Sequence, residues 1–266
     1  LSLRAASQLN FDFGQSLAIG GLANDQAVVG GNLVLDGTLN MSVPIGRSFG
    51  AGLYRVISYG GTLTDNGLVL GTQPVGSQNS VQTAIAGEVN VVNTAGVTVG
   101  FWDGTAPRND GLIGGGSGTW QAAGVGSNDN WTDATAAGNA PYPSGILAIF
   151  AAQPGTVTVD DSLGAVVSGG MQFASSGYVV RGDAITLAAG TNEVLVGDGS
   201  AASTGYVATI AADLTGAGGV DKTDLGTLVL TGANSYTGGT TISAGTLQIG
   251  EGVNGGTSGA IAGNVT

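Results

Sequence analysis

The chain has 266 residues, with 51 glycines, 18 acidic residues and only 6 basic residues, and its net charge is −12. This charge repels phosphate backbones and anionic lipid, which argues against nucleic acid as a partner. The chain contains neither Cys nor His, which excludes disulfides, a Ser-His-Asp triad, a cysteine nucleophile and the usual zinc ligand sets.

The composition predicts an all-β fold. Gly destabilises a helix interior by about 1 kcal/mol relative to Ala, whereas the abundant Thr, Val, Ile, Ser and Asn suit strands and turns. Apolar residues make up 42% of the chain, which is enough to bury a core. The longest apolar run, residues 145–152, is far shorter than the roughly 20 residues of a membrane-spanning helix. We therefore expect a folded chain that does not span a membrane.

Short apolar–polar alternations bounded by Gly, Asn or Asp recur along the chain, and each predicts a strand too short to fold alone. They lie at residues 31–35, 37–41, 61–63, 96–99, 155–159, 183–187, 226–230 and 245–249. The rhythm fades between residues 101 and 144, a stretch rich in Gly, Asn and Asp. We expect coils of strands in residues 1–100, an irregular excursion in 101–144, and further coils in 145–266.

The phrase Gly-Thr-Leu repeats with a spacing typical of a solenoid. It begins at Gly226 and again 19 residues later at Gly245, and at Gly37 and again 24 residues later at Gly61. These periods fit one coil of a solenoid better than a propeller blade or an immunoglobulin domain. The sequence therefore predicts an elongated, right-handed parallel β-helix.

Alternation within residues 226–249 predicts which side chains face the core, because successive side chains of a strand point to opposite faces. The inward set is Leu228, Leu230, Ile242, Leu247 and Ile249, and the outward set is Thr227, Val229, Thr241 and Gln248.

Residues 216–250 resemble the autotransporter-associated β-strand repeat. The resemblance is carried by Lys222-Thr223, Gly226-Thr-Leu228, Tyr236-Thr-Gly-Gly239 and Gly245-Thr-Leu247, in family order. Asp224 is a departure, because family members usually carry Gly at that position. Asp tolerates the left-handed conformation better than most residues, so the turn before Gly226 takes its own form here.

Softer resemblances extend this similarity over most of the chain. Residues 101–104, 118–120, 130–132 and 169–173 are similar to stretches that recur between such repeats in large autotransporters, and residues 30–39 and 54–63 are similar to passenger-domain coils. The resemblance implies a passenger displayed on a bacterial cell surface or secreted, which acts as a structural and adhesive rod. The implied partners are a host-cell receptor, a glycan or a second copy of the chain.

An enzymatic alternative is a carbohydrate-active β-helix that uses an acidic groove, with pairs such as Asp160-Asp161 as its carboxylates. Isolated acids beside Gly or Asn are more typical of turns. The same interpretation applies to Asn128-Asp129-Asn130 with Asp133, which could bind calcium but lacks the repeated calcium motif. We therefore expect no enzyme activity, no metal and no cofactor.

Two groups of residues are candidate binding residues. Trp102, Trp120 and Trp131 all lie in the excursion, where they form either a carbohydrate-stacking platform or the core of a small irregular unit. Arg181-Gly182-Asp183 spells a tripeptide that many adhesins present to integrins, and it lies between two expected strands. Because that tripeptide is also a good turn sequence, an integrin contact requires it to protrude.

Overall fold

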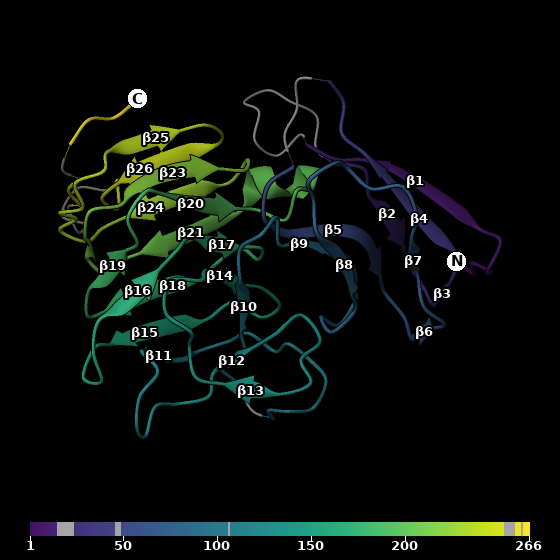
Figure 1. The fold of residues 1–266 in the computed structure, drawn as a ribbon, viewed down its shortest axis with the longest axis horizontal. Coiled ribbons are helices and arrows are strands. Elements are labelled where there is room, and N and C mark those ends of the chain that lie inside the picture. Colours follow the sequence, from purple (N-terminus) through teal and green to yellow (C-terminus); the bar gives the residue numbers. More distant parts are fainter. Residues whose placement is uncertain (15–23, 46–48, 106, 253–258, 262) are drawn as a thin grey trace.

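The computed structural model describes residues 1–14, 24–45, 49–105, 107–252, 259–261 and 263–266 (Figure 1). Within these residues the fold is all-β, apart from a short 3-10 helix, η1 (Ala201–Gly205). The all-β prediction is confirmed. In the part of the chain that the structure describes, no helix has the length and apolarity needed to cross a membrane.

The N-terminal body is built from strands that pair in parallel with strands one coil further along the chain. Gln8 pairs with Thr38, and Leu33 pairs with Leu63, so successive turns of chain lie one above the other. The pairs form sheets β1–β4–β7, β2–β5 and β3–β6. The strands are β1 (Gln8–Asp12), β2 (Ala27–Val29), β3 (Leu33–Leu35), β4 (Thr38–Ser42), β5 (Gly52–Tyr59), β6 (Leu63–Asp65) and β7 (Val69–Leu70).

An antiparallel hairpin follows this first stack. Strands β8 (Asn79–Gln82) and β9 (Glu88–Asn93) pair with each other, and β9 also pairs antiparallel with β5. The connection between them is too short for the crossover that a parallel pair needs, and Gly87 provides a positive φ of 83° in it. The β2–β5–β9–β8 sheet is therefore mixed, a feature that the expectation of continuous parallel coils did not include.

The C-terminal body is a longer stack of parallel strands in three sheets. Their orders are β10–β14–β17–β20–β23–β25, β11–β15–β18–β21–β24–β26 and β16–β19–β22. The strands are β10 (Val99–Trp102), β11 (Gly118–Gln121), β14 (Leu147–Phe150), β15 (Thr156–Asp160), β16 (Val166–Ser168), β17 (Met171–Phe173), β18 (Val179–Gly182), β19 (Ile185–Leu187), β20 (Thr191–Val196), β21 (Val207–Ile210), β22 (Leu214–Thr215), β23 (Gly219–Thr223), β24 (Thr227–Leu230), β25 (Thr240–Ile242) and β26 (Thr246–Ile249).

The core of the C-terminal body consists of ladders of apolar residues. One ladder runs through paired residues Val157, Val180, Ile210, Leu230 and Ile249. Its first four members are fully buried, whereas Ile249 is 39% exposed because β26 is the outermost strand of its sheet. The inward prediction is therefore wrong for Ile249 as the structure has it.

The other side chains of the repeat follow the same logic. Leu228 and Leu230 are buried, as predicted, and Thr241 is exposed. Ile242 and Leu247 are half-buried because they lie on the last strands of their sheets. Val229 was expected to face outward but is only 8% exposed.

Two short antiparallel strands extend the sheet at the other end of this stack. They are β12 (Trp131–Thr132), which pairs with β10, and β13 (Asn139–Ala140), which pairs with β12. Figure 1 shows them below the stacked strands, in the part of the chain that the sequence marks as irregular.

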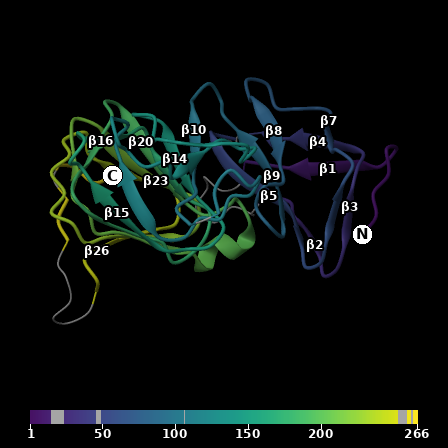
Figure 2. The ribbon, with the colours of Figure 1, turned by 90° about the horizontal axis from the view of Figure 1, so that it is seen from below.

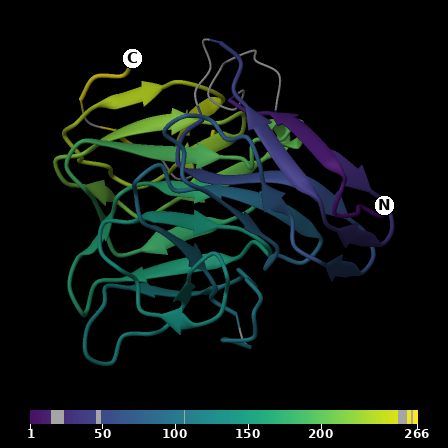
Figure 3. The ribbon, with the colours of Figure 1, turned by 45° about the vertical axis from the view of Figure 1, so that its right-hand side comes forward.

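The two bodies lie side by side (Figures 1 and 3), so the described chain is not one straight rod. Figure 2 shows β5 and β9 at the boundary, next to β10 and β14. Leu53 and Val92 from the N-terminal body share a buried apolar cluster with Phe101 and Ile149 from the C-terminal body. Burial of this cluster holds the N-terminal body against the flank of the other stack.

Replacing Leu228 by Ala should lower the free energy of unfolding by about 2–5 kcal/mol, because it leaves a cavity in a fully buried ladder. Val207→Ala is the control, since the Val207 side chain is 42% exposed and its truncation should change stability by about 0.5 kcal/mol or less. Urea denaturation followed by circular dichroism measures both. Equal losses would contradict the assignment of the core.

Candidate functional site

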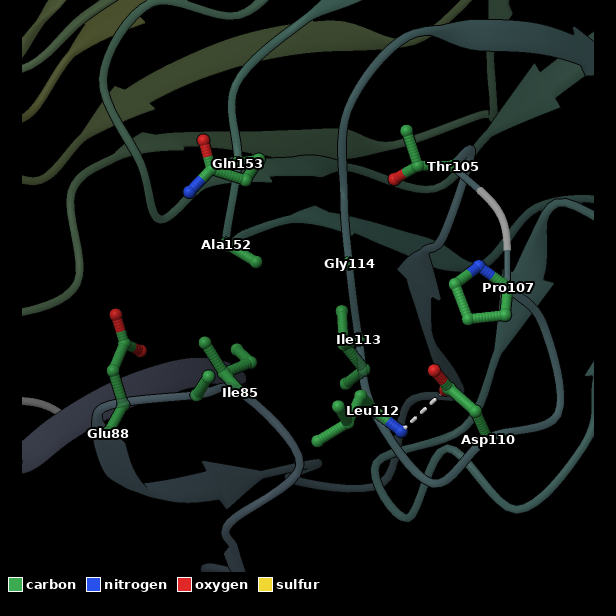
Figure 4. A pocket seen from close by; sticks show the side chains of 11 residues that line it. Ile85, Glu88, Thr105, Pro107, Asp110, Leu112, Ile113, Gly114, Ala152 and Gln153 are labelled. Atoms are coloured by element: carbon green, nitrogen blue, oxygen red, sulfur yellow. Dashed lines mark hydrogen bonds between the residues drawn. The ribbon is translucent and has the colours of Figure 1, made fainter. Parts of the chain in front are cut away.

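A crevice of about 360 Å³ opens between the two bodies (Figure 4). One wall is the β8–β9 connection, with Ile85, Ala86 and Glu88, and the other is residues 105–114 of the excursion. Ala152 and Gln153, just after β14, complete the lining. The volume lies at the lower end of the range of ligand-binding pockets, so the crevice is the candidate binding site.

Backbone hydrogen bonds hold the two walls in place. The Ile113 N–H donates to the Ala84 carbonyl oxygen at 2.8 Å, which joins the excursion to the N-terminal body. The Gln153 N–H donates to the Gly114 carbonyl oxygen at 3.2 Å, and the Gly114 N–H donates to Asp103 Oδ1 at 2.8 Å. Asp103 is 1% exposed, and its Oδ2 accepts a bond from Asn139 Nδ2 at 2.8 Å. The crevice is thus formed by backbone fixed on both sides.

The chemistry of the crevice is an apolar floor with an acidic rim. Ile85 and Ile113 are almost fully buried, while Leu112 is 48% exposed. Asp110 Oδ1 accepts a bond from the Leu112 N–H at 2.9 Å, as Figure 4 shows. None of the described lining residues is basic.

A buried ion-pair network lies beside the crevice and joins the two bodies. Arg55 on β5 contacts Glu88 Oε1 at 2.5 Å and Asp198 Oδ2, beyond β20, at 3.0 Å. The Tyr206 hydroxyl also donates to Asp198 Oδ2, at 3.0 Å. Burial raises the pKa of Glu88, although the Arg55 guanidinium opposes that rise. Arg55 therefore serves carboxylates of both bodies.

Gln172 on β17 makes a second polar connection between the bodies. Its Oε1 accepts a bond from the Leu53 N–H at 2.7 Å, and its Nε2 donates to the Leu53 carbonyl oxygen at 2.8 Å. Sequence reasoning missed Arg55, Asp198 and Gln172. The only sequence signal is that Arg55 and Gln172 stand in otherwise apolar strands, at residues 52–59 and 171–173.

The three predicted Trp residues are all in the core rather than on the surface. Trp102, Trp120 and Trp131 are at most 1% exposed, and the ring centroids of Trp102 and Trp131 are 5.3 Å apart. Trp120 also packs against Phe150, with centroids 5.6 Å apart. A stacking platform needs exposed ring faces, so the core interpretation that the sequence left open describes their positions.

The Arg181-Gly182-Asp183 tripeptide is exposed but does not protrude. Arg181 and Gly182 continue strand β18, where they pair with Thr158 and Val159. The Asp183 N–H donates to the Val159 carbonyl oxygen at 3.1 Å, and Asp183 Oδ2 accepts a bond from the Asp161 N–H at 3.1 Å. The tripeptide therefore lies flat on a sheet, not at the tip of a tight turn between two strands.

Lys222 and Asp224 form a buried polar corner in the repeat. The Lys222 ammonium donates to the carbonyl oxygens of Thr223, Asp224 and Ala244 at 2.6, 2.9 and 3.2 Å. Burial lowers the pKa of Lys222 to about 8 and raises that of Asp224 to about 7. Asp224 has a φ of 60°, so it adopts the left-handed conformation in which Gly is usual.

No group of three or more acidic residues suited to a metal ion occurs in the described residues. The acids considered for calcium act in turns: Asp133 Oδ1 accepts a bond from the Thr135 N–H at 2.8 Å, and Asp160 Oδ1 accepts one from the Ser162 N–H at 2.9 Å. These are the hydrogen bonds of ordinary Asx turns.

Comparison with known proteins identifies two similarities. Residues 220–249, which contain β23 to β26, match the passenger-associated-transport-repeat family. Over 249 residues, or 91% of this chain, the sequence is 48% identical to the adhesin BmaC autotransporter of Brucella suis biovar 1 (strain 1330). The chain spans only 7% of the length of that relative. No solved structure matches the chain.

Replacing Arg55 by Ala should lower the free energy of unfolding by about 3–5 kcal/mol, because Asp198 and Glu88 would lose the cation that compensates their buried charges. Arg4→Ala is the control, since Arg4 is exposed. Thermal or urea denaturation measures the difference. Similar stabilities of the two variants would show that the network does not hold the bodies together.

The free energy of unfolding should rise as the pH falls from 8 to 5. Asp224 has a pKa of about 7 in the folded chain against an ordinary value of 3.8, so the folded state binds its proton first and gains about 2 kcal/mol over this interval. Asp224→Asn, which also tolerates the left-handed conformation, should show a flatter pH profile in urea denaturation. Identical profiles for the two proteins would contradict this prediction.

Proposed function

Because this chain is a segment of an autotransporter passenger that carries the passenger-associated transport repeat, we propose that it is an adhesive part of a bacterial protein displayed on the cell surface or secreted. The observation that carries this proposal is the 48% identity to an autotransporter adhesin over almost the whole chain. Because the chain spans a small part of that relative, the proposal concerns this segment and its own surface.

The scaffold for adhesion is, in this proposal, a right-handed parallel β-helix with structural as well as adhesive work. Its support is the succession of β17, β18, β19 and β20 along the chain, in which β20 returns to pair in parallel with β17. Parallel crossovers are right-handed in nearly all proteins. Such a stack is stable without a cofactor and keeps its attached loops at fixed positions.

Contacts with a partner belong, in this proposal, to the irregular parts of the chain. A coil must keep its turns short so that the next coil can pair with it, whereas residues 103–118 are free of that constraint and form one wall of the crevice. The Arg181-Gly182-Asp183 surface is a secondary candidate because all three residues are exposed. The partner is a host-cell receptor or glycan, or a second copy of the chain.

A non-enzymatic role agrees with the state of the acidic groups. A carbohydrate-cleaving site requires a carboxylic acid and a second carboxylate that are both free to reach the substrate. Glu88, which lines the crevice, bonds to Arg55 through Oε1 and to Asn90 Nδ2 through Oε2 at 3.2 Å. Its two oxygens serve the fold, and we know of no observation in the described residues that favours catalysis.

Beads coated with the purified segment should attach to cultured mammalian cells at least several-fold more than beads coated with serum albumin, another acidic protein. The soluble segment should compete with this attachment, because both forms carry the same surface. Clumping of the beads without cells would identify a second copy of the chain as the partner. Attachment at the albumin level, with no clumping, would overturn the proposed function.

A further inference from the structure

We propose that the crevice between the two bodies binds a cationic side chain, lysine or arginine, presented by a partner protein. This inference rests on the proposed adhesive function and specifies the chemistry of the partner. It follows from the combination of an apolar floor, one available carboxylate and the absence of basic residues from the described lining.

The floor of the crevice fits the aliphatic part of such a side chain. Ile85 and Ile113 form a buried base, and Leu112 is 48% exposed at its edge (Figure 4). Lys and Arg bury their methylene stems along apolar surface while they keep the charged group at a polar rim. Covering Leu112 with a stem removes apolar surface from water, which favours binding.

The rim supplies the charge that such a side chain needs. Asp110 Oδ1 accepts a bond from the Leu112 N–H at 2.9 Å, while Asp110 Oδ2 accepts no hydrogen bond within the described part of the chain. The side-chain amide of Gln153 likewise has no partner among the described residues, so its carbonyl oxygen is available as a second acceptor. The charge of Glu88 is compensated by Arg55 at 2.5 Å. Asp110 is therefore the anion that a ligand meets.

Other classes of ligand fit the crevice less well. An anionic ligand meets the Asp110 carboxylate and a chain with a net charge of −12. A wholly apolar ligand would cover that carboxylate and leave it without a partner, at a high desolvation cost. A sugar ring would find no aromatic side chain to stack on, because none belongs to the described lining.

The crevice is organised before any ligand arrives. The bonds from the Ile113 N–H to the Ala84 oxygen and from the Gly114 N–H to Asp103, both 2.8 Å long, fix the excursion wall against the N-terminal body. A site with fixed walls avoids the entropy cost of ordering a loop on binding. The partner side chain therefore enters an existing cavity.

The test is the binding of short acetylated and amidated peptides, Gly-Gly-Arg-Gly-Gly and Gly-Gly-Lys-Gly-Gly, to the isotopically labelled segment. Nuclear magnetic resonance detects weak binding and identifies the amides that shift. We expect shifts at residues 110–114 and 85–88, weaker binding at 0.5 M salt, and at least fivefold weaker binding of the citrulline peptide, which has nearly the same shape as the arginine peptide but no charge.

Asp110→Asn keeps an oxygen that can accept the Leu112 N–H but removes the charge, and should weaken binding of both cationic peptides at least fivefold. Asp161→Asn is the matched control, because it removes one exposed carboxylate outside the crevice lining, and should leave binding unchanged. Leu112→Ser should also weaken binding, through the apolar floor. Equal effects of the two Asp variants, or equal binding of the citrulline peptide, would overturn the inference.

The inference and the proposed function fail in different ways. If the coated beads attach to cells but no cationic peptide binds the crevice, the adhesive function stands and this inference is wrong. If the peptides bind as expected but the beads do not attach, the crevice chemistry is correct and the adhesive function is wrong.

Discussion

The structure depends on one constraint, which is that each strand must pair in parallel with the strand one coil further along. This pairing satisfies the backbone hydrogen-bonding groups of a chain with few charged side chains. It also fixes the register, so that Val180, Ile210 and Leu230 lie above one another and share one core. Residues that do not fit into a coil must leave it at a corner. Helix η1 is such an insertion: Val194 pairs with Lys222, 28 residues on, whereas Lys222 pairs with Ile242 after 20.

The same constraint explains why the excursion is both irregular and well packed. Val99 pairs with Leu147, so the chain between them makes a detour of more than one coil before it returns to the stack. Trp120, Trp131 and Tyr142 from this detour are buried against Phe150, which belongs to the first regular coil. Deleting the excursion would therefore remove part of the core. Its contribution to binding has to be separated from its contribution to folding by substitutions at exposed residues such as Asp110.

The sequence was sufficient for features that repeat locally and insufficient for those that depend on distant segments. The Gly-Thr-Leu phrases predict β24 and β26, and alternation predicts the burial of Leu228 and Leu230, because both signals lie within one coil. The docking of the two bodies joins Leu53 to Gln172, which are 119 residues apart. The crevice likewise requires residues 85–88 to meet residues 105–114, and no local pattern encodes that meeting. The Trp residues could be assigned to a region but not to its inside or outside.

The burial of Lys222 has a practical consequence for anyone who handles this protein. Lys222 is the sole lysine of the 266 residues, and its side chain is completely buried with its ammonium directed at three carbonyl oxygens. Reagents that acylate lysine reach this nitrogen only when β23 and β25 separate, and local opening of a packed core is rare. Acylation of Lys222 therefore acts as a clock for the opening of the stack. Coupling through lysine would label opened molecules in preference to native ones, so a probe for the native surface has to be attached by other chemistry.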